Sequence, residues 1–276
     1  MSHATTLTAP PTAAPTTSPS PAGRFWRDTG LVLARELRPL LRDPFSMIFG
    51  LIQPLFFLAL FGPLLVASLG GTDALGGDVW LWFVPSILVM TTLFGTTGTG
   101  SNLQMELVSG SHERLLVTPM SRSAMLVGRA LKEVVPVVVQ SLLVVLVMLG
   151  FGMRPDPLGV ALTLGQLAVL GVGIGGFSYA LALAVRQQEW MFWAVQQTVI
   201  FPLMLLSGML LPLDGAPAWM RAVSHADPLR YVVDSARDLF AGDLTASSVA
   251  WGWLAAAVTA AAGLVVGVRA MDRSAG

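Results

Sequence analysis

Three neighbouring residues form the first catalytic candidate in this sequence. Ser224, His225 and Asp227 are the residue types of a nucleophile, a general base and an orienting acid. A working triad needs side chains that converge from separate points of the backbone, whereas neighbours on one short loop do not give this geometry. We therefore predict no catalytic residue and no enzymatic activity for this chain.

A second candidate is the glycine-rich run from Gly171 to Gly176, whose spacing matches dinucleotide-binding loops. Such a loop needs a preceding strand and an acidic ribose partner about 20 residues further on. This run has neither, because it lies inside a long uncharged apolar stretch. Close packing of helices through small residues, with Gly171 and Gly175 four apart, is the better interpretation.

The residue types that bind metals or carry ions are also not grouped. His3, His112 and His225 lie far apart and the chain has no Cys, so we expect no metal and no cofactor on this chain. The long apolar stretches contain no carboxylate that would carry a proton or a sodium ion at membrane depth. If this protein drives transport uphill, the energy must come from another subunit.

The composition of the chain indicates which kind of structural element holds these residues. Of 276 residues, 54% are hydrophobic and 12% are charged, against about 25% charged in a soluble domain. The net charge of zero argues against a nucleic-acid partner. Six stretches reach the roughly 20 residues that a membrane-crossing helix needs: Ser46–Ala67, Val79–Gly100, Val134–Gly152, Gly159–Val185, Trp190–Leu211 and Val249–Ala270.

We therefore predict an all-α integral membrane protein with six transmembrane helices. An N-terminal interfacial amphipathic helix and short helices in the last external loop complete the predicted fold. With the N-terminus placed in the cytoplasm, 12 of the 16 Lys and Arg residues fall on the cytoplasmic side and 4 outside. This bias predicts a multi-pass protein of the cell membrane with both termini cytoplasmic.

The chain before the first span divides into two parts. Residues 1–23, rich in Ala, Pro, Thr and Ser, are predicted to be a disordered cytoplasmic tail. Residues 24–45 are predicted to form the amphipathic helix, with Trp26 and Leu37 on its apolar stripe and arginines opposite. Pro39 is expected to kink this helix or end it early. A merely solvated lead-in is the alternative.

The last external connection, residues 212–248, carries its own helix signals. Asp227 followed by Pro228 is typical of a cap and a first helical residue, and Gly242 is a plausible stop. An apolar stripe lies between them, made of Leu229, Val232, Ala236 and Leu239. We predict a helix that lies along or dips into the outer membrane surface.

Polar groups within the spans raise the question of a substrate path. An amide in hydrocarbon is costly unless it is bonded, so the glutamines of the spans should face protein or a cavity: Gln53, Gln140, Gln166, Gln196 and Gln197. A possible path is formed by Thr92, Thr96, Gln196 and Met204. Packing between helices is the alternative interpretation for the threonines and the methionine.

The connection between the second and third spans mixes charged and apolar residues. Within residues 102–130, a short helix around 102–108, a break at Gly110, a helical piece over 113–117 and a helix capped by Ser121 are predicted. A structured, charged element on the cytoplasmic side is a natural docking surface for a partner. An ordinary amphipathic loop is the alternative.

These residues resemble the type-2 exporter permeases of ATP-binding-cassette (ABC) transporters, and among them the daunorubicin/doxorubicin-resistance permease group. The resemblance covers about residues 24–272, with the transmembrane domain at 46–272. Asp227, Pro228 and Tyr231 also fit the group, while Glu133 stands where the group often has Asp. The motif consists of Glu106, Gly110, Arg114, Pro119, Met120, Ser121, Arg122, Gly128 and Arg129.

The resemblance implies a half-transporter that pairs with a second permease copy in membrane lipid and docks a separate ABC ATPase, which binds ATP and Mg. The coupling helix would lie within residues 106–117, with Glu113 and Arg114 as first contacts. Arg122 and Arg129 would pair with acidic groups of the ATPase or with lipid phosphates. The cargo would be an amphipathic or hydrophobic compound such as an antibiotic. Export of lipid or polymer, and a stand-alone channel or secondary carrier, are the alternatives.

Overall fold

In the computed structural model, every regular element among the described residues is a helix. The described residues are 21–42, 50–69, 79–108, 122–185, 188–213 and 215–273. The helices are α1 (Pro21–Arg42), α3 (Ile52–Leu69), α4 (Val79–Thr97), α5 (Thr99–Val108), α7 (Arg122–Lys132), α8 (Val134–Gly150), α9 (Pro157–Ala184), α10 (Glu189–Leu206), α11 (Ala218–Ser224), α12 (Pro228–Ala241) and α13 (Ser247–Arg273). Residues 1–20, which make up most of the predicted tail, lie outside the described residues.

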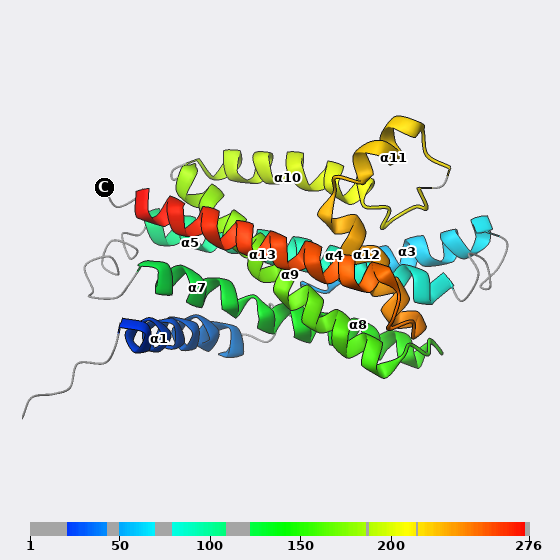
Figure 1. Ribbon diagram of the computed structural model, residues 1–276, viewed down its shortest axis with the longest axis horizontal. Coiled ribbons are helices and arrows are strands. Elements are labelled where there is room, and N and C mark those ends of the chain that lie inside the picture. The colour runs from blue at the N-terminus through cyan, green and yellow to red at the C-terminus, as the bar shows by residue number, and fades with distance from the viewer. Residues whose placement is uncertain are drawn as a thin grey trace, which may run out of the picture.

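Most helices run along the long axis of the molecule (Figure 1). The elements predicted to be cytoplasmic, which are α1, α5, α7 and the end of α13, gather at one end of the bundle (Figure 1). Each predicted span coincides largely with an apolar helix. In the described part of the chain, four helical stretches are long and apolar enough to cross a membrane, at 79–107, 123–150, 157–184 and 247–273, and a shorter apolar helix covers 52–68. The count of six spans stays a prediction.

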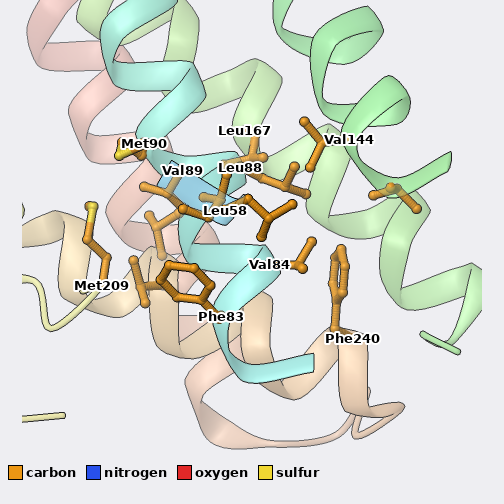
Figure 2. Close-up of a cluster of buried hydrophobic side chains, with 14 of the residues drawn as sticks. Leu58, Phe83, Val84, Leu88, Val89, Met90, Val144, Leu167, Met209 and Phe240 are labelled. Carbon is orange, nitrogen blue, oxygen red and sulfur yellow. The ribbon is translucent and has the colours of Figure 1, made fainter. Parts of the chain in front are cut away.

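Helix α4 lies at the centre of the bundle. Its residues from Phe83 to Leu93 are all buried, on every face of the helix. Figure 2 shows its side chains meeting Leu58 of α3, Val144 of α8 and Phe240 of α12. A helix that is apolar all round must be surrounded by other helices, and α4 is therefore the element against which the others are placed.

The most extensive helix pair, α9 with α13, depends on glycine. A Cβ atom added at Gly263 would lie 2.0 Å from the carbonyl oxygen of Gly173, and one at Gly176 would lie 2.6 Å from the backbone of Gly263. The prediction of close packing through the glycine run is confirmed. The closest contacts come from Gly173 and Gly176, whereas Gly171 and Gly175 face side chains.

Helix α12 begins and ends where the sequence predicts. The Asp227 carboxylate accepts a hydrogen bond of 2.9 Å from the Leu229 backbone N–H, Pro228 is the first helical residue, and Gly242 ends the helix at φ 87°. The predicted apolar stripe is buried, and it packs α12 against α4, α9 and α13. The helix is thus part of the bundle and not a separate surface element.

Helix α1 packs one of its faces against α7. Thr29 and Val32 are buried against α7, whereas the predicted stripe residue Trp26 is 66% exposed. Glu36 on the buried face pairs with basic groups of α7. Pro39 does not end the helix, which continues to Arg42. Contact of α1 with lipid stays a prediction.

The substitution Gly263→Ala should destabilise the fold, because its Cβ atom would collide with Gly173. Overpacking of this kind costs about 1–3 kcal/mol and should lower the melting temperature of the purified chain in detergent. The matched control is Gly30→Ala in α1, where a new Cβ atom meets nothing within 4 Å, so this change should be neutral or slightly stabilising. Equal melting temperatures for both variants would contradict the close contact of α9 with α13.

The buried carboxyl group of Asp227 should make stability depend on pH. Burial raises its pKa from 3.8 to about 6, and the hydrogen bond from Leu229 opposes that rise. The folded chain therefore holds this proton more tightly than the unfolded chain. The resulting stabilisation is fully present below the unfolded pKa and is lost as the pH rises through about 6.

Asp227→Asn tests this dependence, since asparagine also caps helices but does not ionise. The melting temperature of the variant, relative to that of the unchanged chain, should rise between about pH 5 and about pH 7.5. A difference that stays constant over this range, or that falls, would show that the carboxyl group does not titrate as described.

Candidate functional site

The structure describes both ends of the segment that is predicted to dock a partner. Helix α5 follows α4 after a turn at Gly98, and α7 begins at Arg122, directly after the residue predicted to cap it. Outside the described residues lie Gly110, Glu113, Arg114, Pro119, Ser121 and the side chain of Arg122. Their roles stay predictions, and the candidate site is built from the two flanking helices.

An ion cluster joins these flanking helices to α1. Arg129 of α7 pairs with Glu106 of α5 through a charge-assisted hydrogen bond, and its Nε atom lies 3.5 Å from Oε1 of Glu36 in α1. The Nζ atom of Lys132 lies 3.2 Å from Oε2 of Glu36. The Arg129 side chain is only 4% exposed, so these interactions are screened far less than surface ion pairs. Glu36, Glu106, Arg129 and Lys132 are called the basal ion cluster below.

Gly128 permits this arrangement. A Cβ atom there would lie 2.8 Å from the carbonyl oxygen of Thr29 and 2.9 Å from Cβ of Val32. Only glycine lets α1 and α7 approach this closely without a shift of backbone. The Gly128–Arg129 pair of the sequence motif therefore has a local physical role, in which the glycine brings α1 near and the arginine binds its carboxylate.

The structure thus brings together two of the predicted coupling residues, Glu106 and Arg129, although 23 residues separate them. The sequence suggested that Arg129 pairs with a partner protein or with lipid phosphates. In the chain alone its guanidinium is engaged by two internal carboxylates. Glu36, which completes the cluster, was not predicted as a site residue, since nothing in the sequence relates it to a motif 93 residues away.

A cavity of about 490 Å³ lies beside the basal ion cluster. Glu36, Glu106 and Lys132 contribute to its wall, and so does Glu133 at the turn between α7 and α8. The Glu133 side chain is 3% exposed, and its Oε1 atom has no hydrogen-bond partner among the described residues. The sequence assigned no role to Glu133.

The residues predicted to line a substrate path do not lie together. The hydroxyl groups of Thr92 and Thr96 donate to the carbonyl oxygens of Leu88 and Thr92 in their own helix, at 3.0 and 2.7 Å. A Cβ atom at Gly171 would lie 3.2 Å from the methyl group of Thr96 and 3.7 Å from that of Thr92. Both threonines therefore fill the contact between α4 and α9.

Gln196 does line a cavity, one of about 360 Å³ with mostly apolar walls that include Leu93, Phe177 and Val199. Its Nε2 atom donates to the Thr97 carbonyl oxygen at 2.5 Å. Met204 is buried in the apolar core and does not line this cavity. Of the other span glutamines, Gln140 and Gln166 are buried as predicted, while Gln53 and Gln197 are exposed on the surface of the single chain.

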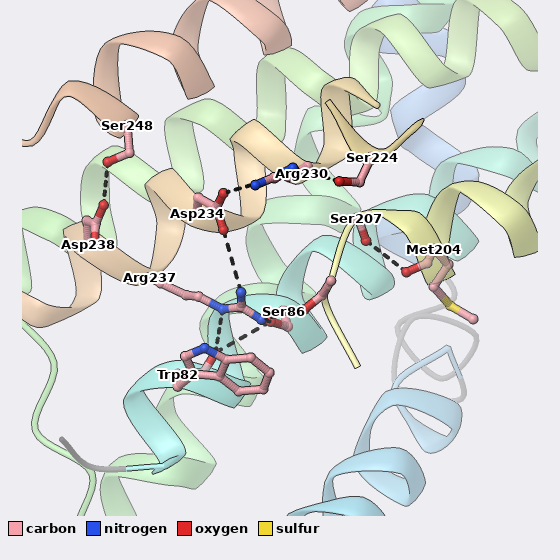
Figure 3. A network of polar contacts seen from close by, with 11 residues as sticks. Trp82, Ser86, Met204, Ser207, Ser224, Arg230, Asp234, Arg237, Asp238 and Ser248 are labelled. Atoms are coloured by element: carbon pink, nitrogen blue, oxygen red, sulfur yellow. Dashed lines mark hydrogen bonds and ion pairs between the residues drawn. The ribbon is translucent and has the colours of Figure 1, made fainter. Parts of the chain in front are cut away.

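Arg237 of α12, whose side chain is 14% exposed, forms a second group of polar contacts (Figure 3). Its guanidinium carbon lies 3.8 Å from the centre of the Trp82 ring, and it donates to Ser86 Oγ at 2.8 Å and to the Gly208 carbonyl oxygen at 2.9 Å. Burial lowers the pKa of Arg237 to about 10, although Asp234 and Asp238 oppose this change. Arg237 therefore ties α12 to α4 and to the end of α10.

The sequence placed Arg237 on the polar face of α12 and gave it no function. One signal was present and not used: Trp82 falls near the predicted outer end of a span, and Arg237 lies in the predicted external connection. Such pairs can stack. The signal does not specify which arginine meets which aromatic ring, because the contact with Trp82 spans 155 residues.

Comparison with known proteins identifies relatives of most of this chain. A family model described as ABC-2 type transporter matches residues 27–241. The chain is 30% identical over 218 residues to a Cyanophora paradoxa protein named as a transport permease, ycf38. The matched region covers 78% of this chain and 75% of that protein.

Two further relatives carry names that refer to drug resistance. The daunorubicin resistance ABC transporter permease protein DrrB1 of Streptomyces coeruleorubidus is 28% identical over 202 residues, covering 72% of this chain and 70% of that protein. A Mycobacterium tuberculosis (strain ATCC 25618 / H37Rv) protein named as a doxorubicin resistance ABC transporter permease, DrrC, is 25% identical over 229 residues, covering 82% and 81%.

Replacing Arg129 by methionine should destabilise the helices around the basal ion cluster. The change leaves Glu36 and Glu106 without their shared cation, and breaking a buried pair in this way costs about 3 kcal/mol. The melting temperature in detergent should fall by several degrees. Arg24→Met, at an exposed arginine of α1, is the control and should have almost no effect. A similar small change in both variants would mean that the cluster contributes nothing to stability.

Proposed function

The chain belongs to the ABC-2 type transporter family, and on that premise we propose that it is the membrane-spanning permease subunit of an ABC exporter. It moves an amphipathic or hydrophobic compound out of the cell. The ATP is hydrolysed by a separate subunit, since its relatives are permeases and the sequence holds no nucleotide-binding loop. The site of action is the cell membrane, with both termini cytoplasmic.

The basal ion cluster is the observation that carries this proposal. The chain from 109 to 121 connects α5 to α7, and the cluster fixes these two helices to each other and to α1. A force applied to the connecting segment therefore acts on three helices as one unit. This is the property expected of a place where an external motor acts on a membrane protein.

The helical connections supply a route from the cluster into the bundle. Helix α7 leads into α8 through the turn at Glu133, and α5 leads back to the central α4 through the turn at Gly98. Docking of an ATPase at residues 109–121 would move α5 and α7 together. The movement would pass to α4 and α8, which pack against each other, and change the access of the bundle from one side of the membrane to the other.

Exposed polar groups support a pairing with a second copy of this chain. Gln197 on α10 is exposed beside large apolar residues such as Val199 and Phe201. An amide that faces hydrocarbon without a hydrogen-bond partner is costly, whereas a protein partner can bond it. We propose that a second permease covers this side of α10 and that lipid covers the remaining apolar surface.

Arg114→Glu tests the coupling assignment. The variant should insert into the membrane normally, because the charge lies outside every predicted span. It should lose export of daunorubicin, the compound named for one relative, and stimulation of the partner ATPase. The readouts are daunorubicin efflux from cells that express the chain with its ATPase, and ATP hydrolysis by the purified complex.

Arg154→Glu is the matched control, an equal charge reversal at an exposed arginine between α8 and α9. It should leave both efflux and ATPase stimulation near the unchanged level. Normal efflux by the Arg114 variant, or equal losses in the two variants, would refute the coupling role of residues 109–121.

A further inference from the structure

The cavity beside the basal ion cluster has the chemistry of a binding site for an organic cation. Three carboxylates contribute to its wall, those of Glu36, Glu106 and Glu133. Lys132 is the basic residue of the wall, and the nearby Arg129 is held between Glu36 and Glu106. The carboxylates therefore outnumber the cations by one.

Glu133 is the most deeply buried of these carboxyl groups, and Thr99 and Lys132 are its neighbouring donors. The closest cation is Lys132, whose Nζ atom lies 4.0 Å from Oε1 of Glu133 and 3.2 Å from Oε2 of Glu36. The lysine is thus shared and lies nearer to Glu36. Oε1 of Glu133 is buried without a hydrogen-bond partner in the described part of the chain. A buried acceptor in this state is costly, and a donor group placed in the cavity beside it would remove that cost.

The remaining wall suits a molecule with an apolar part. Pro39, Leu40 and Pro136 contribute apolar surface, while Thr99 and Gln140 add polar groups. The volume of about 490 Å³ lies within the range of about 300–1,000 Å³ typical of small-molecule sites. An inorganic ion fits less well, because no group of three or more acidic or histidine side chains among the described residues converges to hold a metal.

The position of the cavity matches the place of such a molecule in a membrane. It lies where the charged helices α1, α5 and α7 meet the start of the apolar α8 (Figure 1). At this depth a cationic amphiphile of the inner leaflet keeps its amine among the headgroups and its apolar part in hydrocarbon. The amine and the carboxylates would then lie at the same level.

We propose that this cavity admits the exported compound, that the compound is an amphiphile with a protonated amine, and that Glu133 is the residue that selects its charge. The inference rests on the proposed export function and specifies the class of cargo. It assigns the first binding step to a site within one permease chain, directly beside the ion cluster to which the ATPase would be coupled.

The test is binding of monodansylcadaverine, a fluorescent amphiphile with a primary amine, to the purified full-length chain in maltoside detergent. Its N-acetylated form, which is neutral and nearly equal in shape, is the matched ligand. The amine should bind at least about tenfold more tightly than the acetylated dye, as expected for one charge-assisted interaction. Glu133→Gln should abolish this preference, whereas Glu189→Gln, at an exposed glutamate on α10, should retain it.

One further variant and one lipid competition experiment separate the remaining explanations. Gly95→Leu leaves every charge unchanged and places bulk in the cavity wall, so it should weaken binding of both dyes even if the Glu133 variant fails to fold. Phosphatidylethanolamine supplies the same amine chemistry as a lipid headgroup. Displacement of the dye by this lipid, but not by phosphatidylglycerol, would assign the cavity to lipid and overturn the cargo assignment.

Equal binding of the two dyes, or a preference that survives Glu133→Gln, would also overturn the proposal. These outcomes are separate from a failure of the exporter function, because binding is measured on the permease without ATPase, ATP or transport. A chain that selects no cation can still export neutral compounds and still respond to Arg114→Glu.

Discussion

The pairing of Arg129 with Glu106 and Glu36 is the interaction on which one end of the helical bundle depends. It joins α1, α5 and α7 at a place where the Arg129 side chain is almost completely buried. Charges that are buried are retained only when they are paired. Each of the three helices therefore restricts the other two, and the segment between α5 and α7 is attached to a rigid base.

A different constraint governs the apolar part of the bundle. Hydrophobic burial does little to bring helices together in lipid, so close contact of small residues has to do so. Gly173, Gly176 and Gly263 let α9 and α13 meet backbone to backbone. Helix α4, which is buried from Phe83 to Leu93, packs against both α8 and α9. Arg237 fixes α12 across the first turns of α4, where it contacts Trp82 and Ser86.

Local sequence patterns were sufficient to predict the helices but not the contacts between them. The limits of α12 followed from Asp227, Pro228 and Gly242, because capping and helix termination act within a few residues. The glycine run indicated close packing but not which glycines touch. The face of α1 that packs against α7 could not be predicted, because the partners of Glu36 lie far along the chain. The site was found only in part for the same reason: Glu106 and Arg129 belong to one motif, whereas Glu36, Glu133 and Trp82 with Arg237 are related only by the fold.

We propose that the chain converts no energy of its own and receives it through residues 109–121. The most direct measurement is uptake of daunorubicin into inside-out proteoliposomes that contain the purified chain, with and without its ATPase. Uptake against a gradient should require the chain, the ATPase and hydrolysable ATP together, and should be zero when any one of them is omitted. Uphill uptake by the chain alone, driven by an ion gradient and without ATP, would contradict the account.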